Sequence, residues 1–199
     1  TQFTNRNRIK MANGSGWLTI PVHTKGHKDE TAICDLEVAQ NVKWQRKHLA
    51  SLRGSYARAP YFDALSPALF KIIEASETKL SGFINPITDL LLEQLKLSRK
   101  IVFSSNLMPK SRKADLVLEL CEMQGATRYI SGPFGRDYLD MSAFQDKGIE
   151  VVFHDYPHPT YDQLYGDFQP YMSIVDLLFN CGPDAYDILT SDESALSGR

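Results

Sequence analysis

Two arginines near the start of the chain have the spacing of an anion-binding pair. Arg6 and Arg8 alternate in Asn5-Arg6-Asn7-Arg8, so on an extended strand both side chains point to one face. Two guanidinium groups on one face can bind a phosphate or a carboxylate through paired hydrogen bonds. The alternative is a solvated strand edge whose charges discourage pairing with another chain.

Polar residues also follow predicted strands in the second half of the chain. Strands are predicted over Lys100–Ser104, Arg128–Ser131 and Ile149–His154. In open α/β sheets, ligands bind beyond the carboxyl ends of the strands, so a polar site is expected there. His154 is the candidate general base and Asp155 the carboxylate that orients it, with a structural histidine as the alternative.

The turn that follows the middle strand offers backbone donors. Ser131 and Gly132 lie between that strand and a short predicted helix, where free N–H groups can hold a phosphate. The spacing matches neither a P-loop nor a dinucleotide fingerprint, and an ordinary tight turn is the alternative.

Other candidate binding residues come from helices and a long loop. Arg46 and Arg53 border the apolar face of a helix predicted over about 42–56, where they can reach an anion or cover the core. Lys25 and Lys28 are weaker candidates of the same kind. That apolar face is predicted to contain Val42, Gln45, Leu49, Leu52 and Tyr56, with Trp44 and His48 together on a second face.

An acidic residue and an aromatic loop complete the candidates. Asp176 lies in an otherwise apolar helix after Ser173, and a buried carboxylate needs a partner, for which Arg6 or Arg8 is proposed. Tyr165 belongs to the Pro- and Tyr-rich loop over 155–171, whose rings can stack on a sugar or a base, or cover the sheet edge.

The sequence predicts no metal site and identifies no cofactor. His23 and His27 are four residues apart, but Pro21 and Gly26 favour a loop there. The three cysteines are too scattered for a disulfide or zinc framework: Cys34, Cys121 and Cys181.

Composition narrows the class of protein. The 199 residues carry 22 Lys+Arg against 24 Asp+Glu, which argues against a binder of duplex nucleic acid. No apolar run approaches the roughly 18 residues needed to span a membrane. A cytoplasmic location is predicted from the few cysteines. We expect a single α/β domain over 1–190, with a mainly helical insertion at about 41–97 and a C-terminal tail over 191–199.

The order of predicted elements indicates the fold class. Alternating strands and helices in the second half predict an open, mostly parallel sheet with flanking helices, a three-layer Rossmann-like α/β arrangement. In the insertion, Ser66-Pro67 and Asn85-Pro86 have the pattern of helix starts. The alternative for the second is a helix that begins before Phe83 and contains Pro86.

Stretches over nearly the whole chain resemble the WbqC-like family, which is found in bacterial polysaccharide (O-antigen) gene clusters and in some natural-product clusters. The resemblance implies a preceding strand and a Gln-Pro-x-Tyr-x-Pro-Trp-like segment, which this sequence lacks. If that segment carries essential chemistry, this chain is not the complete enzyme. Tyr138, within a matching stretch, is counted as a candidate substrate-binding residue. The matching stretches are Asn5-Arg6-Asn7-Arg8-Ile9-Lys10, Trp17–Val22, Trp44–His48, Tyr56–Phe62, Gly125–Pro133, Asp137–Leu139, Gln163–Tyr165, Ser173–Asn180 and Gly182–Asp184.

The resemblance to this family indicates a biosynthetic pathway more than a chemical mechanism. The first hypothesis is a transferase of an acyl or aminoacyl-type group that acts on a phosphate-bearing small molecule, such as a nucleotide-sugar or an acyl carrier. The second is a non-catalytic binding or scaffold protein of the same pathway, marked by an exposed apolar patch. The third is a nucleotide-binding domain of the adenylyl-transfer type. The oligomeric state is not predicted.

Overall fold

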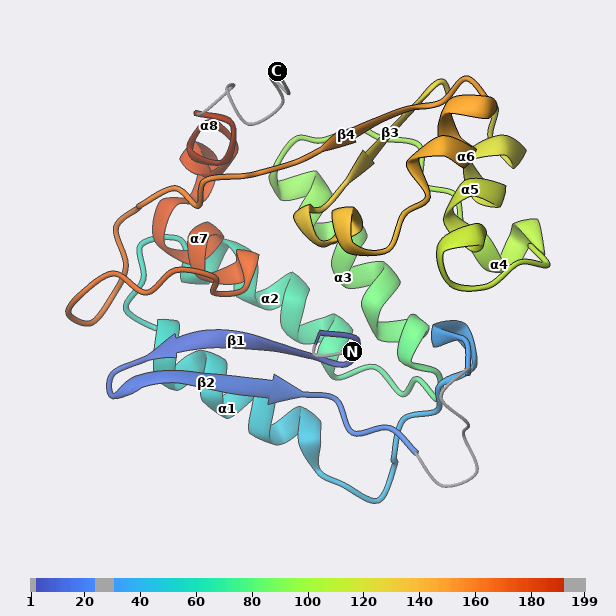
Figure 1. Ribbon diagram of the computed structural model, residues 1–199. Helices are drawn as coiled ribbons and strands as arrows, with labels where there is room; N and C mark the ends of the chain where they lie inside the picture. The colour runs from blue at the N-terminus through green and yellow to red at the C-terminus, as the bar shows by residue number, and fades with distance from the viewer. Residues whose placement is uncertain (1–2, 24–30, 192–199) are drawn as a thin grey trace. The chain divides into compact units, whose positions relative to one another are not determined.

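The computed structural model describes residues 3–23 and 31–191, and its chain trace is drawn in Figure 1. The candidates Lys25, His27 and Lys28 lie outside the described residues. Two compact units are distinguished: Thr1–Ser98 with His158–Leu189, here unit 1, and Arg99–Pro157 with Thr190–Arg199, here unit 2. Each is described by itself, and the expected single domain over 1–190 stays a prediction.

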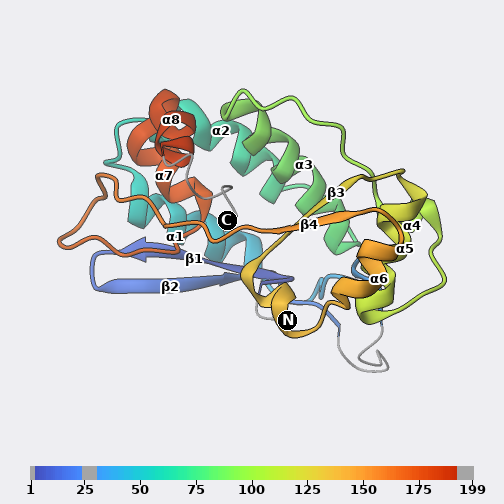
Figure 2. The same ribbon diagram turned by 45° about the horizontal axis from the view of Figure 1, so that its top comes forward.

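Unit 1 consists of a β-hairpin and a set of helices. β1 (Arg6–Met11) pairs antiparallel with β2 (Gly14–Thr19), and Gly14 takes a φ of 125° in the tight turn. Figures 1 and 2 both show the blue hairpin lying along α1. The other elements are η1 (Ile33–Asp35), α1 (Trp44–Tyr56), α2 (Phe62–Ile73), α3 (Leu80–Gln94), α7 (Ile174–Cys181), η3 (Gly182–Asp184) and α8 (Ala185–Thr190).

The core of unit 1 joins the hairpin to the helices. Ile9 of β1, Leu52 of α1 and Leu69 of α2 are buried together with Phe83 of α3 and Phe179 of α7. α7 packs against both β1 and α2. Burial of these large side chains holds β1 against the helices. The position of the strand, and with it of the side chains on its opposite face, is therefore fixed.

Two helices of unit 1 begin earlier than their proline patterns predict. α2 begins at Phe62 rather than Ser66, so Pro67 lies inside it. Phe62 and Leu65 are buried on the same side as later apolar residues, and this packing outweighs the hydrogen bond that proline cannot make. For α3, the alternative is correct: the helix begins at Leu80 and contains Pro86.

The buried face of α1 also differs from the prediction. Trp44 and His48 lie in the core beside Leu49, Leu52 and Tyr56, whereas Val42 precedes the helix and is exposed. The Trp44 ring packs edge-on against both His48 and Phe83, at 4.9 and 5.0 Å between ring centroids. Aromatic packing therefore selects the face that includes these two rings.

Unit 2 contains a parallel pair of strands. β3 (Arg128–Ser131) pairs with β4 (Glu150–Phe153), so both carboxyl ends lie at one edge, as predicted. A small core of Cys121, Leu139, Phe144 and Ile149 lies against the pair. The helical elements are α4 (Ser104–Leu107), α5 (Lys113–Met123), η2 (Pro133–Asp137) and α6 (Met141–Asp146).

One strand predicted in the second half of the chain is absent from the described structure. Residues 100–103 are irregular and α4 begins at Ser104, so the strand prediction there is wrong. Ile101, Val102 and Phe103 are exposed, and without a neighbouring strand an apolar run does not form a ladder. At 33–38 the chain forms η1 and then isolated bridges, Glu37 to Lys79 and Val38 to Val22.

The fold is therefore mixed α/β, with one antiparallel and one parallel pair of strands in the described residues. A three-layer Rossmann-like sheet stays a prediction. No helix within residues 3–23 and 31–191 has the length and apolar character to cross a membrane.

Candidate anion-binding site

One face of β1 carries three cationic residues. Arg6, Arg8 and Lys10 alternate along the strand, and Arg8 lies opposite Trp17 of β2. The guanidinium carbons of Arg6 and Arg8 lie 4.4 and 5.7 Å from the centroid of the Trp17 ring. The predicted common face of the two arginines is therefore formed, and both guanidinium groups lie over one indole ring whose residue is 42% exposed.

Two of these cations have no acidic partner among the described residues. Lys10 is buried, and its Nζ donates to the carbonyl of Asp167 at 2.6 Å. Nη2 of Arg8 donates to the carbonyl of Tyr171 at 3.4 Å, while its buried Nε makes no hydrogen bond. A guanidinium has five donors, so Nη1 and the second hydrogen of Nη2 in Arg8 are not engaged by the described residues.

The loop that follows β4 folds back over this face. Tyr165 and Tyr171 both take left-handed backbone conformations, with φ of 64° and 61°. The hydroxyl of Tyr165 donates to the Gly54 carbonyl at 3.2 Å, and its ring lies under Arg58. His158 accepts from the Tyr171 N–H at 3.1 Å, so it holds the loop rather than a ligand. Tyr165 is thus tied to α1 by its hydroxyl group.

Asp176 is fully buried behind the same strand. Its carboxylate accepts hydrogen bonds from the Tyr56 hydroxyl at 2.7 Å, the Tyr161 hydroxyl at 2.9 Å and the Gln163 amide at 2.7 Å. The partners are therefore neutral donors, and not Arg6 or Arg8 as the sequence suggested. Burial and the nearby carboxylate raise the pKa of Tyr56 well above its usual value, so this donor keeps its proton.

Tyr56 links this network to β1. Its hydroxyl also accepts a hydrogen bond from the Lys10 backbone N–H at 3.0 Å. In addition, the Ser173 N–H at the start of α7 donates to the Arg8 carbonyl at 2.7 Å. The strand that presents the arginines is therefore fixed from its buried side by hydrogen bonds to α1 and α7.

The two helix arginines, Arg46 and Arg53, both lie on α1. Arg53 lies over the Phe70 ring at 4.8 Å, which matches the interpretation that its stem covers the core. Arg46 is exposed on α1. Their proposed role in anion binding is not tested by these contacts.

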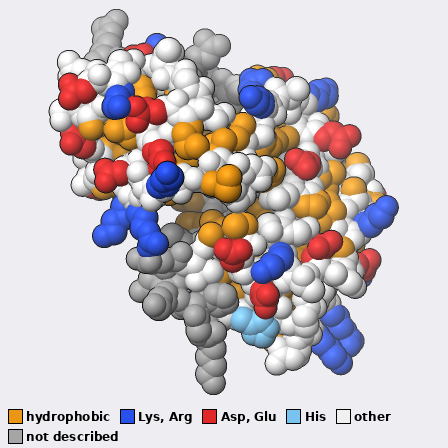
Figure 3. Space-filling model, turned by 90° about the vertical axis from the view of Figure 1, so that its right-hand side faces the viewer, with side chains coloured by type: hydrophobic (Ala, Val, Ile, Leu, Met, Phe, Trp, Pro, Cys, Tyr) orange, Lys and Arg blue, Asp and Glu red, His pale blue; other side chains and the backbone are white. Residues whose placement is uncertain are grey.

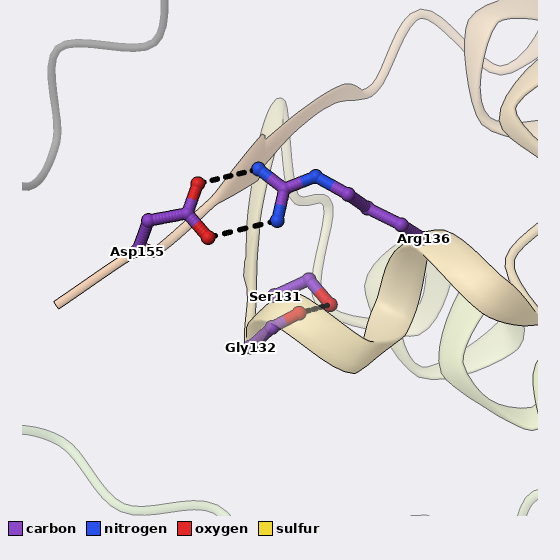
Figure 4. A network of polar contacts seen from close by, with 4 residues as sticks. All are labelled: Ser131, Gly132, Arg136 and Asp155. Carbon is purple, nitrogen blue, oxygen red and sulfur yellow. Dashed lines mark hydrogen bonds and ion pairs between the residues drawn. The ribbon is translucent and has the colours of Figure 1, made fainter.

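Unit 2 brings together the candidates at the strand ends. The His154 N–H donates to the Ser131 carbonyl at 2.8 Å, so Ser131-Gly132 and His154-Asp155 are adjacent. Figure 4 shows both carboxylate oxygens of Asp155 bound by the Arg136 guanidinium, at 2.8 and 2.5 Å. The hydrogen bond from Arg136 holds the pKa of the Asp155 carboxyl below its usual value.

The side chains around this edge differ in availability. Ser131 is buried, and its hydroxyl donates to the Gly132 carbonyl at 3.1 Å. The His154 ring stacks on Tyr156, with centroids 5.3 Å apart. Tyr138 is exposed at the end of η2. His154 and Tyr138 can therefore meet a ligand, whereas the Ser131 hydroxyl is occupied.

Comparison with known proteins identifies the family. The model of the WbqC-like protein family matches residues 1–188. The chain belongs to the WbqC-like family. It is similar to the uncharacterized protein Rv1507c of Mycobacterium tuberculosis (strain ATCC 25618 / H37Rv), with 34% identity over 192 residues, which cover 94% of this chain and 81% of that relative. No solved structure matches the chain.

In this WbqC-like protein the candidates fall into two sets, one in each unit. Arg6, Arg8 and Asp176 belong to unit 1, and Ser131 and His154 belong to unit 2. Within the described residues, no group of three or more His, Cys, Asp or Glu side chains could hold a metal ion.

The sequence reasoning on the WbqC-like chain missed Lys10 and Tyr56. The period of two from Arg6 and Arg8 extends to Lys10, so that signal was present. Tyr56 had no such signal, because its partner Asp176 is 120 positions away.

On the face drawn in Figure 3, acidic and basic side chains are interspersed, without a broad surface of one charge.

Proposed function

We propose that this WbqC-like protein binds a phosphate-bearing small molecule on the Arg6–Arg8 face of β1 and transfers an acyl or aminoacyl-type group. The observation that carries the proposal is the Arg8 guanidinium, whose one hydrogen bond to the described residues goes to a backbone carbonyl. Phosphate oxygens accept paired hydrogen bonds from a guanidinium, so they match this unused capacity.

Trp17 supports a substrate with a ring next to its phosphate. Its indole is partly exposed, and both guanidinium groups lie over it. A sugar or a base can stack on such a ring while the phosphate meets the guanidinium groups. This favours a nucleotide-sugar over inorganic phosphate as the ligand.

The pathway in this proposal comes from the resemblance to the WbqC-like family, which is found in bacterial polysaccharide gene clusters. We propose a transferase of O-antigen or related natural-product biosynthesis that acts in the cytoplasm. His154 stays the proposed general base, a role that rests on its position directly after β4 within unit 2. Asp155 is paired with Arg136, so its part would be to fix the local structure. A three-layer Rossmann-like sheet is proposed for this chain.

A binding or scaffold protein of the same pathway is the second candidate. Unit 2 exposes several large apolar side chains, including Phe134 at 78% and Met108 at 79% exposure. Exposed apolar surface of this kind is typical of contacts with other proteins. The candidate predicts complex formation with a pathway enzyme and no binding of nucleotide-sugars.

Calorimetric titration with UDP-glucose and with acetyl coenzyme A tests the first proposal. Arg8→Gln removes the charge and is expected to weaken binding by about 10- to 100-fold. Arg53→Gln is the matched control, because that arginine lies over Phe70. Equal affinity in wild type and Arg8→Gln, or no binding of either compound, would overturn the proposal.

A further inference from the structure

Unit 1 contains a cavity of about 270 Å³ on the side of the hairpin that faces the helices. Aliphatic side chains from several elements line it: Ile9, Leu18, Leu52, Leu69, Ile87 and Leu91. Its size is at the lower end of the range for small-molecule sites, which are also mostly apolar. The cavity is therefore suited to a small aliphatic group.

Several of the polar lining residues lie where the hairpin opens. Asn5 and Asn7 flank Arg6 at the start of β1, and all three line the cavity. Arg6 pairs in register with Thr19 at the end of β2. His48 lines the cavity too, and its Nε2 lies 3.0 Å from the Thr19 carbonyl. The asparagines, Arg6 and His48 thus mark one polar end.

His48 presents a hydrogen-bond acceptor at this end. A carbonyl can only accept, so Nε2 carries the proton in the bond to Thr19. Burial lowers the pKa of His48, and the hydrogen bond to Thr19 offsets this in part, so the ring is neutral at pH 7. Nδ1 is then the acceptor, and no group in residues 3–23 or 31–191 donates to it.

His48 is also only 8% exposed. Among the described residues only Nε of Arg8 is a buried side-chain atom without a partner, so Nδ1 of His48 is accessible and a ligand can supply its donor. Arg6 is the one charged residue among those that line the cavity. The donor is therefore expected at the end of an otherwise apolar ligand.

We propose that this cavity binds an aliphatic chain whose polar end, a hydroxyl or an amide N–H, donates a hydrogen bond to Nδ1 of His48. A volume of about 270 Å³ holds about nine non-hydrogen atoms at roughly 30 Å³ each, the volume of a water molecule in the liquid. Under the function proposed above, on which this step rests, the chain is the acyl part of the substrate.

A series of 1-alkanols from butanol to decanol tests the site by methyl NMR titration of the full chain. Affinity should rise about fourfold for each added methylene. The rise should stop near 1-octanol, which has the nine non-hydrogen atoms expected from the volume. Absence of saturable binding by 1-octanol would overturn the proposal.

Two substitutions on α3 locate the binding. Ile87→Trp fills the cavity and should abolish alkanol binding, whereas Leu90→Trp is the control because Leu90 does not line it. Ile84→Phe, also at a lining position, replaces the first variant if that variant does not fold. Equal binding in wild type and the filled variant would place the alkanol elsewhere and overturn the proposal.

A second comparison tests the role of His48. 1-Methoxyheptane matches 1-octanol in size but has no hydrogen-bond donor. The affinity for 1-octanol divided by the affinity for this ether should be several-fold higher in wild type than in His48→Phe. An unchanged ratio in His48→Phe would refute the hydrogen bond.

The alkanols carry no phosphate, so their binding does not depend on Arg8. If the wild-type protein binds the alkanols but not UDP-glucose, only the anion site is refuted. If it binds UDP-glucose but not the alkanols, only the cavity site is refuted.

Discussion

The Tyr56 hydroxyl is the hydrogen bond whose removal should most disturb the arginine face. Tyr56→Phe keeps the buried ring and deletes one oxygen atom. That oxygen donates to Asp176 at 2.7 Å and accepts from the Lys10 N–H at 3.0 Å. The substitution therefore affects a fully buried carboxylate and a buried backbone donor together.

The magnitude follows from these two contacts. A hydrogen bond to a charged group contributes about 1.5–3 kcal/mol, and a buried N–H left without a partner costs about 1–3 kcal/mol. Tyr161 and Gln163 still donate to Asp176, which limits the loss. We expect the free energy of unfolding to fall by about 3–5 kcal/mol.

Urea denaturation followed by tryptophan fluorescence measures this change, because Trp17 and Trp44 are the two tryptophans and both lie in unit 1. Tyr165→Phe is the matched control. Its hydroxyl makes an exposed hydrogen bond to the Gly54 carbonyl, so the loss should be below about 1 kcal/mol. Equal, small losses in both variants would refute the proposed anchoring of β1.

Three further outcomes follow from other contacts. Burial lowers the pKa of His48 below 6.5 in the folded chain, so the free energy of unfolding should fall as the pH drops below about 6.5. In a series of urea midpoints measured at different pH values, His48→Gln should reduce this pH dependence. An unchanged slope in the variant would contradict the prediction. Gly135→Ala should lower the stability of unit 2, measured by hydrogen exchange of β3 amides, because the new Cβ would collide with the Ser131 side chain; wild-type protection would contradict this. Arg136→Gln should raise the pKa of the Asp155 carboxyl toward its usual value in a carbon-13 NMR titration, and a constant value would show that the ion pair does not form.

Local periodicity predicted the parts of the site that lie on one element. The alternation of Arg6 and Arg8 predicted their common face. The predicted parallel strands implied that the residues at their carboxyl ends, Ser131 and His154, lie at the same edge. Both follow from the geometry of a strand, which the residues of that strand determine.

Features that depend on distant contacts were not predictable in the same way. The bonds of Asp176 to Tyr56 and Tyr161 join residues from three elements, and no spacing in the sequence encodes them. Ser66-Pro67 has the local pattern of a helix start, but that prediction was wrong, because the packing of Phe62 makes α2 begin four residues earlier. Tertiary packing thus decided both cases.

The strand predicted over Lys100–Ser104 shows a third limit. Its apolar composition is suited to a buried strand, yet the described structure leaves the segment irregular and exposed. A strand exists only when a neighbour pairs with it, and composition says nothing about the neighbour.

The most direct test of the anion site observes the Arg8 side chain itself. In a nitrogen-15 NMR titration with UDP-glucose, the Nη resonances of Arg8 should shift and saturate, because the one hydrogen bond of this guanidinium to the described residues goes to the Tyr171 carbonyl. The resonance of Arg53, which lies over Phe70, should stay in place. A stationary Arg8 resonance at saturating UDP-glucose would contradict the account.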